Sequence, residues 1–91
     1  MYQINFTTKF KKDYKNISNN SNLLKEVDKV IDIISDKGTL PKKYKPHPLK
    51  GNYTDCIEAH IKPDLLIIWI IVNHKEKTID LIRLGSHSDL F

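Results

Sequence analysis

The feature that most constrains this fold is an unbroken apolar run over residues 65–72. A strand with one buried face alternates apolar and polar side chains, so a continuous run indicates a central strand covered on both faces. The run is also far shorter than the about 20 residues that a helix needs to cross a bilayer. We therefore predict a strand at the centre of a sheet and no membrane partner.

The segments on either side of this run are predicted to be its neighbours in the sheet. Alternating side chains predict strands over residues 55–61 and 78–84, with Gly85 ending the second. The turns between the three strands are short and polar, with Pro63 and Asp64 forming the first. This pattern favours a three-stranded antiparallel meander.

The first part of the chain predicts one strand and two helices. Apolar and polar residues alternate over residues 2–6, which indicates a short strand. Apolar residues then recur at helical spacing over 10–17 and again over about 23–36, where Gly38 fits a left-handed C-cap. Two consecutive helices after one strand suggest a helical hairpin. We expect it to pack on one sheet face and to leave the other partly open.

The segment 39–52 is predicted to be irregular and basic. Pro41, Pro46 and Pro48 prevent regular pairing, and four lysines lie among them. The expected order is therefore strand, helix, helix and then three strands, an α+β fold. An apolar fraction of 40% suffices for one core, so we expect residues 1–91 to form a single domain.

Charge and cysteine content restrict the environment and the partners. The formal net charge of +4 favours a polyanion such as nucleic acid, although many unrelated domains are equally basic. Cys56 is the only cysteine, so no intramolecular disulfide can form. We expect a reducing, cytoplasmic location and a structural thiol.

Histidines and one arginine are the candidates for chemistry. RNA can be cut without metal when a base activates the 2′-hydroxyl, a cation stabilises the phosphorane and an acid protonates the leaving oxygen. His60 and Asp64 flank one turn, Arg83 lies on a largely apolar strand, and His87 follows the end of that strand. We predict that these four residues meet at one rim of the sheet.

Each candidate also has a structural alternative. His47, between two prolines, fits a plain loop residue, and His60 fits a solvated side chain on a polar strand face. Arg83 fits a structural ion pair, for which the candidate partners are Asp80, Glu58 and Asp64.

A metal site is the rival chemical interpretation. His60 and Asp64 could be ligands, with His47 or His87 completing the set. The spacing resembles no tight metal motif, and Lys62 and Arg83 would add positive charge nearby. We expect neither a metal nor another cofactor.

A set of short motifs, in order along nearly the whole chain, resembles a known family. It is the YafQ-type toxins of the RelE/ParE superfamily. The motifs are Leu40-Pro41, Tyr44, His47-Pro48-Leu49, Gly51, Glu58-Ala59-His60-Ile61-Lys62-Pro63-Asp64 and Leu84-Gly85-Ser86-His87-Ser88-Asp89-Leu90-Phe91. The resemblance implies the RelE-like fold and the toxin of a type II toxin–antitoxin system. It also implies an endoribonuclease that cuts mRNA in the ribosomal A site, and an antitoxin encoded by a neighbouring gene.

The resemblance also implies residue roles. His87 is expected to be the general acid, Asp64 with His60 the base, and His47 a phosphate contact, while Arg83 stabilises charge. Phe91, Lys50 and Lys62 are the expected substrate-binding residues.

Two positions depart from the family pattern, and two other functions remain open. Leu65 stands where members often have tryptophan, and Ile57 where many have a basic residue. An aromatic side chain at the first position could stack on a base, and leucine stacks poorly. The alternatives are a non-catalytic ParE-like inhibitor of DNA gyrase and a plain RNA-binding module. Neither needs the histidine and aspartate set.

Overall fold

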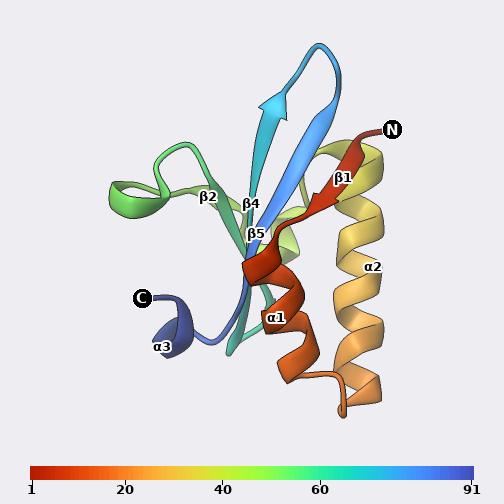
Figure 1. Cartoon of the computed structure of the whole chain (residues 1–91), viewed down its shortest axis with the longest axis vertical. Helices are drawn as coiled ribbons and strands as arrows, with labels where there is room; N and C mark the ends of the chain where they lie inside the picture. The colour runs from red at the N-terminus through yellow and green to blue at the C-terminus, as the bar shows by residue number, and fades with distance from the viewer.

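A five-stranded sheet forms the centre of the computed structural model, which describes all 91 residues (Figure 1). Its strand order is β1-β5-β4-β3-β2, with β1 parallel to β5 and the other pairs antiparallel. The strands are β1 (Gln3–Phe6), β2 (His47–Pro48), β3 (Ile57–Lys62), β4 (Leu65–Asn73) and β5 (Thr78–Gly85). The helices are α1 (Thr8–Asn16), α2 (Ser21–Lys37) and α3 (His87–Leu90), with 3₁₀ turns η1 (Lys42–Tyr44) and η2 (Gly51–Tyr53). No helix combines the length and apolar character that a bilayer crossing needs.

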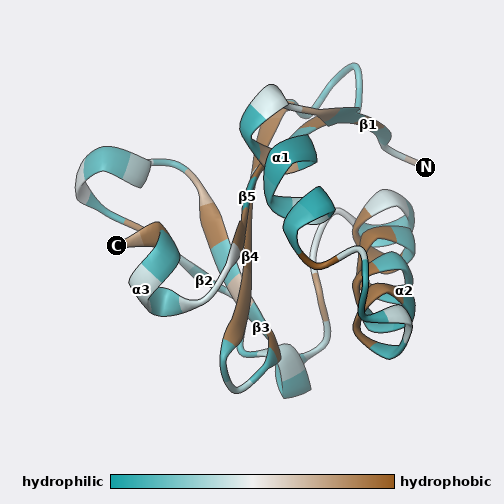
Figure 2. Cartoon of the chain, turned by 60° about the horizontal axis from the view of Figure 1, so that its bottom comes forward, coloured by the Kyte–Doolittle hydropathy of each residue, from teal (hydrophilic) through white to brown (hydrophobic).

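Strand β4 is buried on both faces over residues 65–69, as the apolar run predicted, whereas Val72 at the end of the run is 57% exposed. On one face Ile67 and Trp69 join the main core beneath α1 and α2. On the other face Leu66 and Ile68 form a smaller cluster with Leu90 of α3. Figure 2 shows the hydrophobic colour following β4 and the inner side of α2. The predicted α+β fold and the three-stranded meander are confirmed.

The two helices form the predicted hairpin on one side of the sheet (Figure 1). Thr7 caps α1 by accepting the Phe10 N–H, and Asn20 caps α2 by accepting the Leu23 N–H. Helix α2 ends at Gly38, whose φ of 78° is left-handed. The Trp69 indole donates to the Gly38 carbonyl at 3.2 Å, so the helix end is fixed to the central strand.

The edge strand β2 and the C-terminal turn α3 were not predicted. The sequence prediction that residues 39–52 form no regular pairing is wrong for His47 and Pro48, which pair with β3. Proline is tolerated there because β2 is an edge strand of two residues. The second element, α3, is a single turn closed by a capping box between Ser86 and Asp89.

We predict that Gly38→Ala destabilises the protein more than Gly51→Ala does. Both glycines have left-handed backbones, with φ of 78° and 71°, so each alanine costs about 1–2 kcal/mol in strain. An added Cβ at Gly38 would also lie 2.8 Å from the Tyr2 ring, whereas at Gly51 nothing lies within 4 Å. Urea denaturation of both variants measures the difference. Equal losses would show that Tyr2 moves away freely.

Candidate active site

The predicted site residues lie largely on the sheet face opposite the helical hairpin. Residues directly opposite one another in neighbouring strands share a face, and the register pairs His47 with Glu58, Glu58 with Ile68 and Ile68 with Arg83. These four residues form one row across four strands. His60 lies in the next row, opposite Leu66. With strands about 4.8 Å apart, Glu58 and Arg83 lie about 10 Å apart across the sheet.

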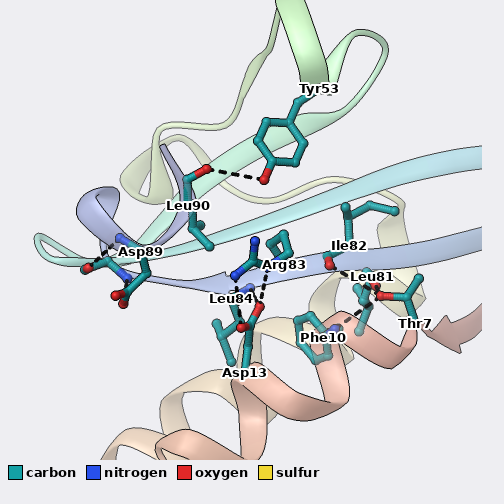
Figure 3. Close-up of polar contacts among 11 residues, drawn as sticks. Thr7, Phe10, Asp13, Tyr53, Leu81, Ile82, Arg83, Leu84, Asp89 and Leu90 are labelled. Atoms are coloured by element: carbon teal, nitrogen blue, oxygen red, sulfur yellow. Dashed lines mark hydrogen bonds and ion pairs between the residues drawn. The ribbon is translucent and has the colours of Figure 1, made fainter.

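Arg83 is held by a carboxylate from the first helix. Its Nε donates to Asp13 Oδ2 at 2.7 Å, and a terminal nitrogen donates to Oδ1 at 3.2 Å (Figure 3). The backbone N–H of Leu84 also donates to Asp13 Oδ2, at 3.0 Å. Hydrogen bonding to Asp13, aided by Tyr53, raises the pKa of Arg83. The guanidinium is therefore a permanent cation with a fixed orientation.

Asp13 is a residue that sequence reasoning missed. Asp80, Glu58 and Asp64 were the expected partners of Arg83, and none of them forms an ion pair with it. Asp13 lies 70 residues away along the chain, on the predicted first helix. Only the packing of α1 beside β5 brings the two together.

Glu58 is the only buried charged residue, with 6% of its surface exposed. Its Oε1 lies 3.2 Å from His47 Nε2, and the Lys45 carbonyl oxygen lies 3.0 Å from His47 Nδ1. The imidazole is therefore contacted at both of its ring nitrogens. These contacts fix the orientation of the His47 ring, which suits the predicted phosphate contact. The sequence pattern placed Glu58 on the polar face of its strand but showed no partner.

The C-terminal turn positions His87 and Phe91. The Ser86 hydroxyl accepts the Asp89 N–H at 3.2 Å, and an Asp89 carboxylate oxygen accepts the Ser86 N–H at 3.0 Å. These Ser86 contacts, with the charge of Arg83, lower the pKa of the Asp89 carboxyl. The cap is therefore complete at neutral pH and weakens only as the pH falls through that lowered pKa.

His87 itself is exposed, and its ring forms no hydrogen bond within the protein. The Phe91 ring stacks on it at a centroid distance of 4.8 Å. Tyr53 contacts Phe91 edge-on at 5.5 Å and donates to the Leu90 carbonyl at 3.3 Å (Figure 3). The imidazole is therefore free to exchange a proton with a bound substrate.

The remaining candidates are not joined to this group by hydrogen bonds. Asp64 is exposed in the β3–β4 turn and forms no ion pair with His60, Arg83 or His87. Lys50 is exposed just before η2. His60 is half-buried and has no hydrogen-bond partner. No three His, Cys, Asp or Glu side chains gather as a metal site would require.

A helical hairpin on one face of a five-stranded sheet is the arrangement that this chain shares with solved bacterial toxins. Residues 2–91 match the family described as "Bacterial toxin of type II toxin-antitoxin system, YafQ". The chain belongs to this YafQ family.

Individual relatives support the same assignment. The mRNA interferase toxin YafQ of Escherichia coli K12 is 34% identical over 59 residues, which are 65% of this chain. The match spans 61% of that relative's own length. A metal-bound toxin from Helicobacter pylori superposes with a TM-score of 0.86 at 45% identity, covering 100% of both chains. The toxin in the E. coli DinJ–YafQ toxin–antitoxin complex gives a TM-score of 0.84 at 25% identity, covering 99% of this chain and 97% of that one.

We predict that Asp13→Asn lowers the free energy of unfolding by about 2 kcal/mol, because charged hydrogen bonds of this kind contribute about 1.5–3 kcal/mol. The pair is well shielded, with 12% of the Asp13 side chain and 21% of the Arg83 side chain exposed. Asp36→Asn is the matched control, because Asp36 forms an exposed pair with Lys37. Denaturant titration gives the stabilities, and the NMR signal of Arg83 Nε–H reports its order. Equal stability of the two variants would contradict a structural role for Asp13.

Proposed function

We propose that this chain is an mRNA endoribonuclease, the toxin of a type II toxin–antitoxin pair. The observation that carries the proposal is the open sheet face. There the oriented imidazole of His47 and the fixed cation of Arg83 flank a surface that also carries His60 and the exposed His87. The curated relative at 34% identity is an mRNA interferase. A gyrase inhibitor or a plain binding module needs no such proton-transfer groups.

The proposed reaction is attack of a 2′-hydroxyl on the adjacent phosphate. His60 with Asp64 accepts the hydroxyl proton, and Arg83 stabilises the charge that develops on the phosphorane. His87 donates a proton to the departing 5′-oxygen. Each atom is then accounted for, and the products are a 2′,3′-cyclic phosphate and a 5′-hydroxyl. Protein side chains supply every group, so the reaction needs no metal.

His47 and Glu58 act together in this scheme. His47 contacts a phosphate oxygen of the RNA, and Glu58 keeps the imidazole oriented. Because only 6% of Glu58 is exposed, the RNA does not contact its carboxylate directly. Glu58 is therefore a positioning residue rather than a catalytic one.

The RNA base at the cleavage site is proposed to stack on Phe91. Leu65, where relatives often carry tryptophan, is buried in the helix-side core and cannot reach a base. Phe91 is 56% exposed and is supported by Tyr53 and His87. An aromatic ring on a rigid support is suited to sequence-tolerant stacking. Ile57, half-buried against the same core, adds no charge to this surface.

The proposed partners are the ribosome, its A-site mRNA and a cognate antitoxin, all in the cytoplasm. The related E. coli toxin has been crystallised with the antitoxin DinJ. A net charge of +4 favours an antitoxin with an acidic segment that masks the basic face.

Expression of this chain alone is predicted to arrest growth by stopping translation. Cutting mRNA in the A site stalls ribosomes directly, so incorporation of labelled amino acids should fall before incorporation of labelled thymidine. Co-expression of the neighbouring antitoxin gene should restore growth. Continued protein synthesis with stalled replication would instead support the gyrase inhibitor.

His87→Ala is predicted to slow cleavage by about 10²–10⁴-fold, the usual contribution of a general acid. Binding should change little, because an acid acts mainly in the transition state. Single-turnover cleavage on programmed ribosomes measures the rate, and co-sedimentation measures binding. His74→Ala is the control, because His74 lies in the exposed turn at the far end of β4. Wild-type cleavage by His87→Ala would show that another histidine is the acid.

A further inference from the structure

A cationic hollow of about 210 Å³ lies at the end of β3 nearest the β3–β4 turn. Two of its lining lysines, Lys43 and Lys45, come from the η1 segment, and Lys62 comes from the end of β3. His60 completes the polar lining, with Ile61 and Pro63 as the remaining residues. No carboxylate lines the hollow.

The positive charge in this hollow is not neutralised within the protein. The ion pairs of the chain involve Lys37, His47 and Arg83, and none involves Lys43, Lys45 or Lys62. Three lysines line this small space, and the Lys43 ammonium also lies 5.1 Å from the centre of the Tyr44 ring, so an anion bound there is attracted by three positive charges.

The acidic residues of the surrounding elements do not neutralise the lysines of the hollow. Glu58 of β3 is already paired with His47. Asp64, in the turn after the hollow, is exposed and forms no ion pair. Glu26 of α2 borders a separate hollow with Lys62 but forms no ion pair with it.

The hollow is connected to the candidate active site through Lys45. This residue ends η1 in the left-handed conformation, with φ 53° and ψ 51°, and its carbonyl faces His47 Nδ1 at 3.0 Å. The side chain of Lys45 and the ring of His47 are therefore positioned by one short loop. His60 is two residues along β3 from Glu58, about 7 Å at the usual rise of a strand.

We propose that this hollow binds one backbone phosphate of RNA in the same strand as the phosphate that is cut. The proposal rests on the proposed function and adds a subsite to it. The lysines supply charge without a carboxylate to compete, and β2 pairs only with Ile57 and Glu58. Beyond Glu58, η1 packs beside β3, and residues of both segments line the hollow. Lys43 and Lys45 would fix the RNA along the sheet, while the row from His47 to Arg83 acts on it.

The test compares two variants that each lose three lysine charges. The first carries Lys43→Gln, Lys45→Asn and Lys62→Gln, with asparagine chosen because it tolerates a left-handed backbone. The matched control carries Lys29→Gln, Lys75→Gln and Lys77→Asn. Lys77 is also left-handed, with φ 55°, and the three control lysines are exposed away from the hollow.

Binding to a single-stranded 2′-O-methyl RNA oligonucleotide, which lacks the attacking hydroxyl, is measured by fluorescence anisotropy at several salt concentrations. Each phosphate contact contributes about 0.7 to the slope of log affinity against log salt for a single strand. Because the hollow is proposed to bind one phosphate, its variant should lose about 0.7 from the slope, and the control should keep the wild-type slope.

The same comparison on vacant ribosomes, by co-sedimentation, distinguishes the source of the phosphate. A loss on the oligonucleotide supports a site for the mRNA strand that is cut. A loss on vacant ribosomes alone would assign the hollow to ribosomal RNA and would overturn the proposal. Unchanged slopes on both, or equal losses in the control, would overturn it, and weakened antitoxin binding with unchanged slopes would assign the hollow to an acidic peptide. Because the oligonucleotide cannot be cut, failure of the phosphate site is distinguishable from failure of the nuclease assignment.

Discussion

The position of Arg83 depends on which groups form hydrogen bonds with the outer edge of β5. Strand β1 pairs with β5 only as far as Leu81, so the following part of β5 would have an open edge. Thr7 closes the first gap by donating its hydroxyl to the Leu81 carbonyl at 2.7 Å. Asp13, on the next helix, then accepts the Leu84 N–H and the Arg83 guanidinium together. The same carboxylate thus completes the sheet edge and orients the cation, so the fold and the site share one contact.

The open face exists because the two sides of the sheet are covered unequally. Both helices of the hairpin pack on one face, where most of the buried apolar side chains lie. The other face has only a small cluster in which Leu90 of α3 covers Leu66 and Ile68. That cluster buries the centre of β4 on this face and leaves the neighbouring parts of the face to polar side chains. A single turn of helix is enough to do this because the capping box holds it in place.

The sequence predicted the elements well and their contacts poorly, for a physical reason. Periodicity and an unbroken apolar run depend on local burial, so they located β4 and both helices. The pairing of Asp13 with Arg83 and of His47 with Glu58 depends on which strands and helices become neighbours, and no local pattern records that. Pro48 misled the prediction because proline is excluded from central strands but tolerated at an edge. Ser86 and Asp89 have the spacing of a capping box, so the sequence contained the information that could have predicted α3.

The polar side chains of the open face and of the hollow are of two kinds. Some are held in a fixed orientation by a carboxylate, and the others mainly attract phosphate. Arg83 and His47 are each fixed by one carboxylate, Asp13 and Glu58, so their orientation is set before RNA arrives. Such paired side chains add little net charge and attract a polyanion weakly at long range, but they need no reorganisation during the proposed reaction. The lysines around the hollow have the opposite character, since none forms an ion pair and each adds a positive charge that attracts phosphate. In the proposed nuclease, most of the RNA affinity would come from the lysines and most of the rate from the paired side chains. Salt should therefore weaken its binding much more than it slows the cleavage of RNA already bound.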